Sequence, residues 1–379
     1  ISYVIAIIRM GVIFALILNL TADKIGRRPM LLVTICGFAL MTGITAGAMN
    51  VYWFTLVQCM AKMFIHTEYL LSNISILEEF DTGDRGWAVG AISSLCVMGS
   101  ALCIIMYGPL GSYEYGWRVL YAIGVLPLVV LAFLRRNLPE TRLFERKQAA
   151  ENEDIHDVTN QTFIRRFLKP FRDLQGHYVL LIKSCVLLFV RGFCGFPAEF
   201  FMFKVLQERY GYSTLEVTAI TIGGGALSIF AYVSAGKLSD RVGRRPVLSV
   251  IYALYFATLI AFYNSDGGAF TVISWVLFAA SMFGLDVLNA ALVSEIFPTL
   301  TRATATAVVV VVQVIGTVIG IVVEGAIYQK TRDHWRSTTL VSLPGFVCVG
   351  LVWLLPESAF SNLDDSEHPD GIQMEQRGI

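Results

Sequence analysis

Long apolar segments alternate with short polar ones along the chain. A hydrocarbon layer about 30 Å thick is crossed by roughly 20 residues of α-helix. Backbone polar groups in lipid must be satisfied within the segment, so runs of this length predict helices, whereas a β-barrel would show alternating strands of about ten residues. The pattern predicts an all-α polytopic membrane protein. Eleven such runs lie at 2–20, 29–49, 51–76, 87–107, 117–134, 178–203, 214–236, 246–264, 269–292, 303–328 and 337–355.

The longest polar stretch divides these runs into five and six. A second polar stretch closes the chain; it is acidic and has no capacity to build a core. We therefore expect an N-terminal bundle over residues 1–134, a linker with short helices over 135–177, a C-terminal bundle over 178–358 and a tail over 359–379.

Basic residues are unevenly divided between the two sides of the predicted membrane. One set of connections carries eighteen Lys and Arg residues and the opposite set carries six. Cytoplasmic loops carry an excess of these residues. We therefore expect the linker, the loops after Leu20 and Gly236, and the C-terminal tail to be cytoplasmic.

The two groups of helices repeat each other at a fixed offset of 217 positions. Asp23 corresponds to Asp240, for example, and Arg27 to Arg244. Because each copy keeps the same direction, the repeat is parallel, with its axis along the membrane normal. Further matched pairs are Gly26/Gly243, Arg28/Arg245, Pro29/Pro246, Glu78/Glu295, Phe80/Phe297, Arg85/Arg302, Leu138/Leu355, Pro139/Pro356 and Glu140/Glu357.

The repeat also predicts a helix that this chain does not contain. Ile1 aligns with Thr218, inside the second helix of the repeated unit, so the helix near 178–203 has no counterpart. We expect a fold of 12 helices in two six-helix bundles, with the first helix missing through an N-terminal truncation and 11 present. An eleven-helix protein is the alternative.

Composition narrows the class of protein. The 379 residues are 55% hydrophobic and 15% charged, with a mean hydropathy of +0.64, whereas a soluble domain averages about a quarter charged residues. The net charge is zero, which argues against a nucleic-acid partner, because such proteins present a basic surface. All seven cysteines lie in apolar runs without a CxxC pair and are expected to act as small hydrophobes. A soluble enzyme and a disulfide scaffold are excluded.

Two loop motifs carry a family resemblance. Residues 22–29 read ADKIGRRP and residues 236–246 read GKLSDRVGRRP, each between two apolar runs. They resemble the G-x-x-x-D-R-x-G-R-R loop of the major facilitator superfamily, although Asn19 replaces the leading glycine and Lys24 the first arginine of the first copy. The resemblance implies the major facilitator fold and secondary transport by alternating access.

Further motifs are similar to the sugar-porter and metabolite:proton symporter branches. Glu78 and the Arg-Gly dipeptide at 85–86 match the end of the family's fourth helix. Residues 139–142 (PETR) match Pro-Glu-Ser/Thr-x-Arg with the arginine one place early, and residues 294–302 (SEIFPTLTR) are close to E-x-F-P-T-x-x-R.

The resemblance assigns these charged loops a gating role at the cytoplasmic helix ends. The arginines can pair with glutamates on neighbouring helices and hold the cytoplasmic side of the two bundles together, and such pairs must break when that side opens. Charge that only sets topology is the alternative. The expected gate residues are Asp23, Lys24, Gly26, Arg27, Arg28, Glu78, Arg85, Glu140, Arg142, Asp240, Arg241, Gly243, Arg244, Arg245, Glu295 and Arg302, with Glu357 as a further partner.

Eight ionisable residues lie at membrane depth, where each costs about 2.5–3.5 kcal/mol on insertion scales and needs a partner, a cavity or a function. A carboxyl group desolvated in a cavity can take up a proton near neutral pH. Glu68 is our candidate proton carrier; Asp286 lies within one residue of its repeat-related position, and an ion pair of Glu68 with Lys62 or Arg9 is the alternative. The eight are Arg9, Lys62, Glu68, Lys183, Arg191, Glu199, Asp286 and Glu324.

Two of these residues suggest an anionic substrate. Arg191 lies in mid-span among glycines and phenylalanines, and its planar donor fork suits a carboxylate. Arg9 can act in the same way from the opposite half. Pairing of Arg191 with Glu199 or Asp286 explains the charge equally well.

Other features need no transport role. Lys183 and Glu324 lie nearer the span ends, where snorkelling or a loop partner is enough. His66 is expected to be a satisfied polar group, with modulation of nearby Glu68 as the alternative. Gly316 and Gly320 form a GxxxG motif, which predicts a close helix contact.

We therefore expect secondary active transport of a small organic solute, with proton symport for uptake of an organic acid or similar metabolite as the preferred mode. Efflux members of the superfamily usually carry a Gly-Pro signature in the fifth helix, whereas Gly108-Pro109 falls past the end of the run at 87–107. The alternatives are a proton-coupled efflux antiporter, a sugar-type facilitator and a non-transporting receptor with a transporter fold.

The sequence shows no catalytic triad, no metal-ligand spacing and no Walker motif. We expect no cofactor and a proton gradient as the energy source. The expected partners are the solute, protons and the lipid bilayer, without nucleic acid, and the expected state is a monomer. The short loops favour a bacterial inner membrane, with both ends of the full-length protein cytoplasmic.

Overall fold

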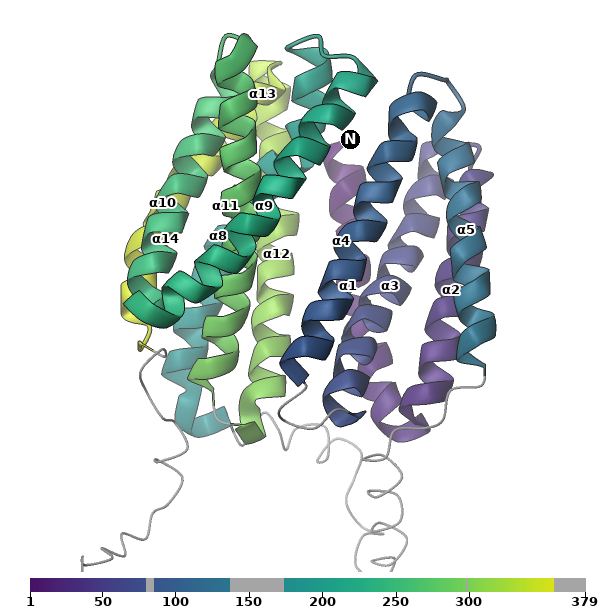
Figure 1. Cartoon of the computed structure of the whole chain (residues 1–379), viewed down its shortest axis with the longest axis vertical. Coiled ribbons are helices and arrows are strands. Elements are labelled where there is room, and N and C mark those ends of the chain that lie inside the picture. Colours follow the sequence, from purple (N-terminus) through teal and green to yellow (C-terminus); the bar gives the residue numbers. More distant parts are fainter. Residues whose placement is uncertain (80–84, 137–173, 298, 358–379) are drawn as a thin grey trace, which may run out of the picture.

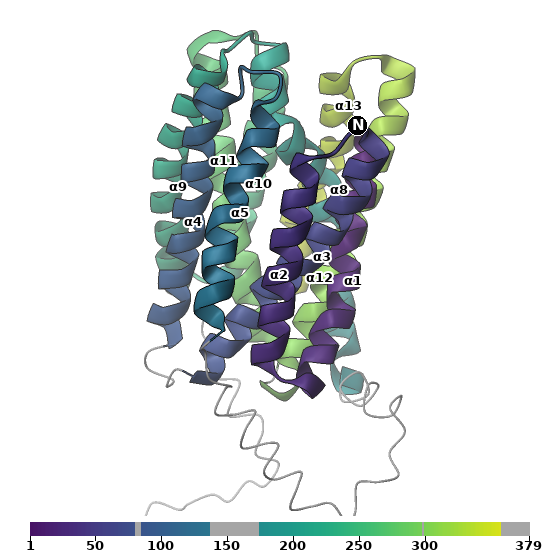
Figure 2. The ribbon, with the colours of Figure 1, turned by 90° about the vertical axis from the view of Figure 1, so that its right-hand side faces the viewer.

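The structure is a computed structural model of the 379-residue chain. It describes residues 1–79, 85–136, 174–297 and 299–357, and these are helical with no strand. Figure 1 shows two groups of helices standing side by side, and Figure 2 shows the same ribbon turned by 90°. Most of the expected linker and the whole expected tail lie outside the described residues.

The first half contains the five predicted helices. The apolar runs account for them, and the chain reverses direction between each pair (Figure 1). They are α1 (Ser2–Ile25), α2 (Arg27–Ala46), α3 (Val51–Glu79), α4 (Arg85–Leu110) and α5 (Gly116–Arg135).

The second half contains the six predicted crossings. A short 3₁₀ helix, η1 (Leu174–His177), leads into the first of them, and the last is built from four consecutive short helices. The elements are α8 (Tyr178–Glu208), α9 (Thr214–Val242), α10 (Arg244–Tyr263), α11 (Gly268–Ile296), α12 (Thr299–Thr331), and then α13 (His334–Ser342), η2 (Leu343–Phe346), α14 (Val347–Leu351) and η3 (Val352–Leu354).

Nine helices of the described chain are long and apolar enough to cross a membrane, and the last of these runs without a break from His334 to Leu354. The other two crossings are α3 and α4. Helix α3 is less apolar because it carries Lys62 and Glu68, and the apolar segment found in α4 is the shorter one over Met98–Leu110. Both stand in the same group as α1, α2 and α5 in Figure 1. The eleven predicted crossings are therefore present as helices.

The end of α4 differs from the prediction. The helix extends to Leu110, so Gly108 and Pro109 lie in its last turn and not beyond its end. A Cβ atom on Gly108 would lie 3.1 Å from Oγ1 of Thr218 in α9. The small residue therefore allows α4 to approach the second half closely.

One glycine in each repeat separates two consecutive helices at equivalent points. Gly26 separates α1 from α2 with φ 114° and ψ 156°, and Gly243 separates α9 from α10 with φ 112° and ψ 150°. Side chains other than that of glycine rarely adopt such a positive φ. The two copies of the loop motif thus have the same backbone conformation, 217 residues apart, which supports the predicted repeat.

Both glycine breaks lie at one end of the molecule, which is also where α5 ends and α8 begins (Figure 1). We call it the basic end, because Arg27 and Arg244 follow the two glycines. The connections α8–α9, α10–α11 and α12–α13 lie at the opposite end. This common placement of the two motifs is what a parallel repeat requires.

The two halves meet along two seams, α1 against α12 and α4 against α9. Ile5 and Ala6 of α1 belong to the hydrophobic core of the second half. Near the opposite end, the Gln207 amide donates a hydrogen bond to the Tyr107 hydroxyl at 3.1 Å. Hydrogen bonds between the halves thus reinforce the seams at that end.

The predicted GxxxG contact is confirmed within the second half. Cβ atoms on Gly316 and Gly320 would lie 2.4 Å and 2.2 Å from the carbonyl oxygens of Phe189 and Phe193 in α8. Gly192 of α8 approaches α12 just as closely, since its Cβ would lie 2.5 Å from the Gln313 carbonyl oxygen. Helices α8 and α12 therefore pack backbone to backbone.

Replacement of Gly320 tests this contact. Gly320→Ala should lower the free energy of unfolding by about 1–3 kcal/mol, because the new methyl group has no space against the α8 backbone. The matched control is Gly225→Ala in α9, where no atom lies within 4 Å of the added Cβ. Unfolding in dodecyl sulfate followed by circular dichroism measures both. Equal stability of the two variants would contradict the described packing.

Candidate functional site

A buried ion-pair cluster occupies the middle of the second half. Nη2 of Arg191 in α8 lies 2.8 Å from Oε1 of Glu199 and 3.2 Å from Oδ1 of Asp286 in α11. The Arg191 side chain is 4% exposed, but that of Asp286 is 55% exposed. A carboxylate that faces lipid at this depth would be expensive, so we expect Asp286 to face a water-accessible space.

A tyrosine of α10, Tyr255, completes this cluster. The Tyr255 hydroxyl donates a 2.6 Å hydrogen bond to Oε1 of Glu199, and its ring centre lies 5.4 Å from the Arg191 guanidinium carbon. Gly195 makes room for it, since a Cβ there would lie 2.5 Å from the Tyr255 hydroxyl oxygen. Of the two uses predicted for Arg191, the structure shows pairing with Glu199 and Asp286. Its charge is therefore already balanced inside the protein.

The first half presents a different arrangement, a group of three basic side chains, of which Arg9 and Lys62 carry the charge. Lys62 and His66 are one helical turn apart in α3, and Arg9 lies on α1, which packs against α3. Each of the three lies within electrostatic range of the other two. Among the described residues, no carboxylate lies within 4.0 Å of Arg9 or Lys62. We call these three residues the cationic cluster.

Arg9 links this cluster to the second half. Its guanidinium carbon lies 4.0 Å from the centre of the Phe196 ring in α8, a cation–π geometry. Glu199 is within electrostatic range of Arg9 but makes its ion pair with Arg191. The cationic cluster therefore faces the interface of the two halves, as a site for a solute between them would have to.

Glu68 is buried elsewhere in the first half, toward the basic end. It forms an ion pair with Arg135 at the end of α5, and its Oε2 accepts a 2.5 Å hydrogen bond from the Thr34 hydroxyl. Ser72 donates a further, longer bond to Oε1 at 3.4 Å. The predicted alternative, a pair of Glu68 with Lys62 or Arg9, is wrong, because the partner is Arg135, which the sequence placed at the start of the linker and the structure places at the end of α5.

The loop motif of the second half is a network of charges at the basic end. The Arg244 side chain donates to both Glu295 oxygens, at 3.0 and 2.6 Å, and lies 2.7 Å from Asp240. The backbone N–H groups of Arg244 and Arg245 donate to Glu357 at 2.6 and 3.1 Å. These contacts lie within the second half and tie α9, α10, α11 and the end of the last crossing together.

Gly243 is required in this network. It has the positive φ described above, and a Cβ would lie 3.0 Å from Oε2 of Glu357. Arg241, also predicted as a gate residue, is exposed. Within this half, the expected pairing of the loop arginine with glutamates on neighbouring helix ends is therefore present.

The equivalent network of the first half is described only in part. Gly26 has its matching conformation, Arg27 is buried, and Nη2 of Arg28 donates a 2.8 Å bond to the carbonyl oxygen of Arg136. The remaining predicted gate residues lie outside the described residues or have side chains that do; they are Asp23, Lys24, Glu78, Arg85, Glu140, Arg142 and Arg302.

Sequence reasoning missed two features of the site. It considered Lys62 only as a possible partner of Glu68, and His66 as a satisfied polar group or a modulator of Glu68, although their spacing of four residues on one helix signals a shared face. It also missed Tyr255, which no motif marks. The cationic cluster becomes visible only when α1 is packed against α3.

Comparison with known proteins agrees with this fold. A family model of the Major Facilitator Superfamily matches residues 2–263 and again 216–373. The chain is 23% identical over 307 residues to the cis,cis-muconate transport protein of Acinetobacter baylyi, covering 80% of this chain and 71% of that protein. It is 25% identical over 311 residues to the citrate-proton symporter of Klebsiella pneumoniae, covering 75% and 65% respectively.

Solved structures share the architecture. The xylose transporter XylE from E. coli, in a partially occluded inward-open conformation, matches with a TM-score of 0.74 at 17% identity over 96% of this chain and 88% of that one. Two bundles of membrane-crossing helices with a repeated basic loop define a polytopic transport protein and not an enzyme. The chain belongs to the Major Facilitator Superfamily.

Removal of Arg191 tests the ion-pair cluster. Arg191→Gln should lower the free energy of unfolding by about 3–5 kcal/mol, because two carboxylates lose their cation. Adding Glu199→Gln should recover part of that loss. The control is Lys204→Gln, whose partner Glu208 is 58% exposed and whose loss should cost no more than about 1 kcal/mol. Equal losses for Arg191→Gln and Lys204→Gln, measured by unfolding in dodecyl sulfate, would refute the cluster.

Proposed function

We propose that this protein is a proton-coupled symporter that takes up small organic anions by alternating access. The observation that carries the proposal is the cationic cluster of Arg9, Lys62 and His66. Unpaired charge at membrane depth is expensive unless a partner or a function accounts for it. An anionic solute supplies that partner, and Arg9 and Lys62 offer charge-assisted hydrogen bonds to its carboxylates.

The second half supports an anion in a different way. Arg191 is balanced by Glu199 and Asp286, so the substrate cations we propose are Arg9 and Lys62, with Arg191 holding the opposite wall in place. Phe196 lies against the Arg9 guanidinium and presents an apolar surface to the carbon skeleton of the solute. A small, partly unsaturated carboxylic acid suits such a wall.

The names of two relatives point the same way. One is called a cis,cis-muconate transport protein and the other a citrate-proton symporter, and both solutes are organic acids. The second name includes the proton, which supports symport. We further propose a monomer in a bacterial inner membrane, with the basic end in the cytoplasm in accordance with the loop charges.

Glu68 is the proton carrier in this proposal. Its ion pair with Arg135 would be weakened by protonation, since a neutral carboxyl no longer balances the guanidinium. Arg135 adjoins Arg136, whose carbonyl oxygen binds Arg28 of the loop motif. A proton on Glu68 therefore acts, through Arg135, on the contacts of the first loop motif at the basic end.

The direction of transport is not decided by the Gly-Pro pair. The sequence argument against efflux placed Gly108-Pro109 outside the helix, but α4 includes both residues. Uptake is proposed on the symporter resemblance and on the relatives, and the flux measurement below tests it directly.

The substrate class is tested by flux into proteoliposomes. Under an inward proton gradient, the protein should accumulate at least one of labelled cis,cis-muconate, citrate and nicotinate, and not xylose. Arg9→Gln and Lys62→Gln should each lower anion uptake about tenfold or more, since a hydrogen bond to a charged group contributes about 1.5–3 kcal/mol. The control Lys204→Gln removes a cation of α8 that is paired with Glu208 and should transport normally.

Xylose accumulation, or undiminished anion uptake by Arg9→Gln and Lys62→Gln, would overturn the anion proposal. Reversal of the proton gradient adds a test of direction. Anion uptake driven by the reversed, outward gradient would identify an efflux antiporter instead.

The proton role of Glu68 has a separate test. Glu68→Gln should abolish accumulation driven by a pH gradient while preserving exchange of internal for external labelled anion, because exchange needs no net proton movement. Glu208→Gln, which removes an exposed carboxylate, is the control. Gradient-driven accumulation that survives Glu68→Gln would show that the proton is carried elsewhere.

A further inference from the structure

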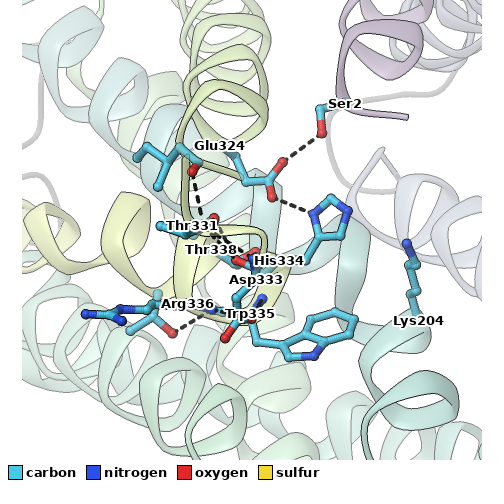
Figure 3. A network of polar contacts seen from close by, with 12 residues as sticks. Ser2, Lys204, Glu324, Thr331, Asp333, His334, Trp335, Arg336 and Thr338 are labelled. Carbon is cyan, nitrogen blue, oxygen red and sulfur yellow. Dashed lines mark hydrogen bonds and ion pairs between the residues drawn. The ribbon is translucent and has the colours of Figure 1, made fainter. Parts of the chain in front are cut away.

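A second buried carboxylate lies where the two halves touch, far from Glu68 in the sequence. Oε2 of Glu324 in α12 accepts a 2.7 Å hydrogen bond from the hydroxyl of Ser2 in α1, and its Oε1 lies 2.9 Å from Nδ1 of His334 at the start of α13 (Figure 3). The carboxylate therefore connects the first half to the last crossing of the second half. Of the two roles expected for Glu324, snorkelling is wrong because its side chain is 0% exposed, whereas a partner beside the adjoining turn is present in His334.

Aromatic rings enclose this pair. The His334 imidazole stacks on Tyr328, with ring centres 3.7 Å apart and planes inclined by 6°. Phe201 of α8 lies on another side of it, with ring centres 5.1 Å apart. Gly325 lets α1 approach, since a Cβ there would lie 3.0 Å from the Ser2 Cβ. The contact of the halves thus helps to exclude water from the Glu324–His334 pair.

The other ionisable groups around the pair are either bonded to partners of their own or exposed. From α8, Lys204 pairs with Glu208 at 3.5 Å and Glu199 pairs with Arg191. From α10, the Tyr263 hydroxyl donates to the Ala198 carbonyl oxygen at 2.7 Å. Asp333 caps α13, and Tyr3 of α1 and the basic residues that flank the turn are exposed; those residues are Lys330, Arg332 and Arg336.

His334 is therefore the one group at bonding distance of Glu324, within the described chain, that can carry positive charge. A carboxylate and an imidazole that share one proton have no net charge as a pair. Loss of that proton would leave an uncompensated negative charge on a buried carboxylate, which is strongly unfavourable.

We propose that Glu324 and His334 form a proton-binding site at the end opposite the basic end, and that the proton held there keeps the two halves in contact. By linkage, a proton that prefers the closed arrangement shifts the population toward it. Low pH therefore favours closure of this end and high pH favours its opening. The step itself transfers one proton from water to a nitrogen or carboxylate oxygen of the pair, and opening returns it to water.

The direction of proton movement in this inference rests on the proposed function. In a symporter with the basic end in the cytoplasm, the site is loaded by external protons as the outer end closes. The proton-binding property itself depends only on the described contacts and needs no knowledge of the solute.

The repeat provides a neutral counterpart at the equivalent position. Tyr107 lies 217 residues before Glu324 and also contacts the other half at this end, by accepting the Gln207 hydrogen bond. Its hydroxyl takes part there as a neutral hydrogen-bonding group. The two seams thus have related contacts, one that can change charge with pH and one that cannot.

Distance measurements across this end test the inference. Spin labels on cysteines at Tyr113 and Leu215, which are 71% and 64% exposed on opposite halves, report its opening by electron paramagnetic resonance. The full chain, with its native cysteines replaced by alanine, is placed in lipid nanodiscs without solute. Between pH 5 and pH 9, the short-distance population should fall by about tenfold relative to the long-distance one.

Variants assign the pH response to the pair. Glu324→Gln should keep the short distance at every pH, because the amide is neutral and still accepts from Ser2. Glu324→Asp, which keeps an ionisable carboxylate, should restore the response and so separates titration from damage to packing. The matched control Tyr107→Phe should weaken closure equally at all pH values and leave the pH response intact.

An unchanging distance in the unmodified pair, or a normal pH response in Glu324→Gln, would overturn this inference. Either result leaves the anion-uptake proposal standing, because that proposal is tested by flux with Arg9 and Lys62 variants. Conversely, failure to accumulate any anion would remove the proposed substrate without affecting the distance measurements.

Discussion

A charge inside a bilayer must be balanced, and the arrangement of this protein follows from how each charge meets that requirement. Arg191 is balanced by Glu199 and Asp286, and Glu68 by Arg135. The cationic cluster stands apart from these pairs, since no described carboxylate lies within ion-pair distance of Arg9 or Lys62. Within the described chain, the charges of the ion-pair cluster in the second half are therefore balanced, whereas Arg9 and Lys62 of the first half have no carboxylate at ion-pair distance. This difference is the physical basis for proposing an anionic solute.

The repeat is preserved in the backbone and lost in the central charges. Gly26 and Gly243 adopt the same unusual conformation, and each precedes a helix that starts with arginine. At membrane depth, in contrast, Arg9 aligns with Ala226 and Lys62 with Ala279. Loop conformations that end one helix and begin the next are demanded of both halves alike. A solute has no such twofold symmetry, so the residues that face it are free to diverge.

Much of the fold was predictable because lipid leaves a chain few options: helices of sufficient length, ended by glycine and flanked by arginine. The contact of Gly316 and Gly320 with α8 was predictable for the same reason. The partners of Glu68 and Glu324 were not, because Arg135 lies 67 residues from the first and Ser2 lies 322 residues from the second. Hydropathy gives the depth of a side chain but not the rotation of its helix. The cationic cluster needed that rotation, since Arg9 and Lys62 come from different helices.

The backbone contact between α8 and α12 has a further mechanical consequence. Three glycines bring these helices together so closely that neither can slide or roll on the other without a steric clash. Helix α12 also forms a seam with α1 of the other half. Motion of the second half must therefore carry α8 and α12 as a rigid pair, and slippage is left to the α1–α12 and α4–α9 boundaries. A distance measured between α8 and α12 should then stay constant during transport and can serve as the internal reference for distances that change at the two seams.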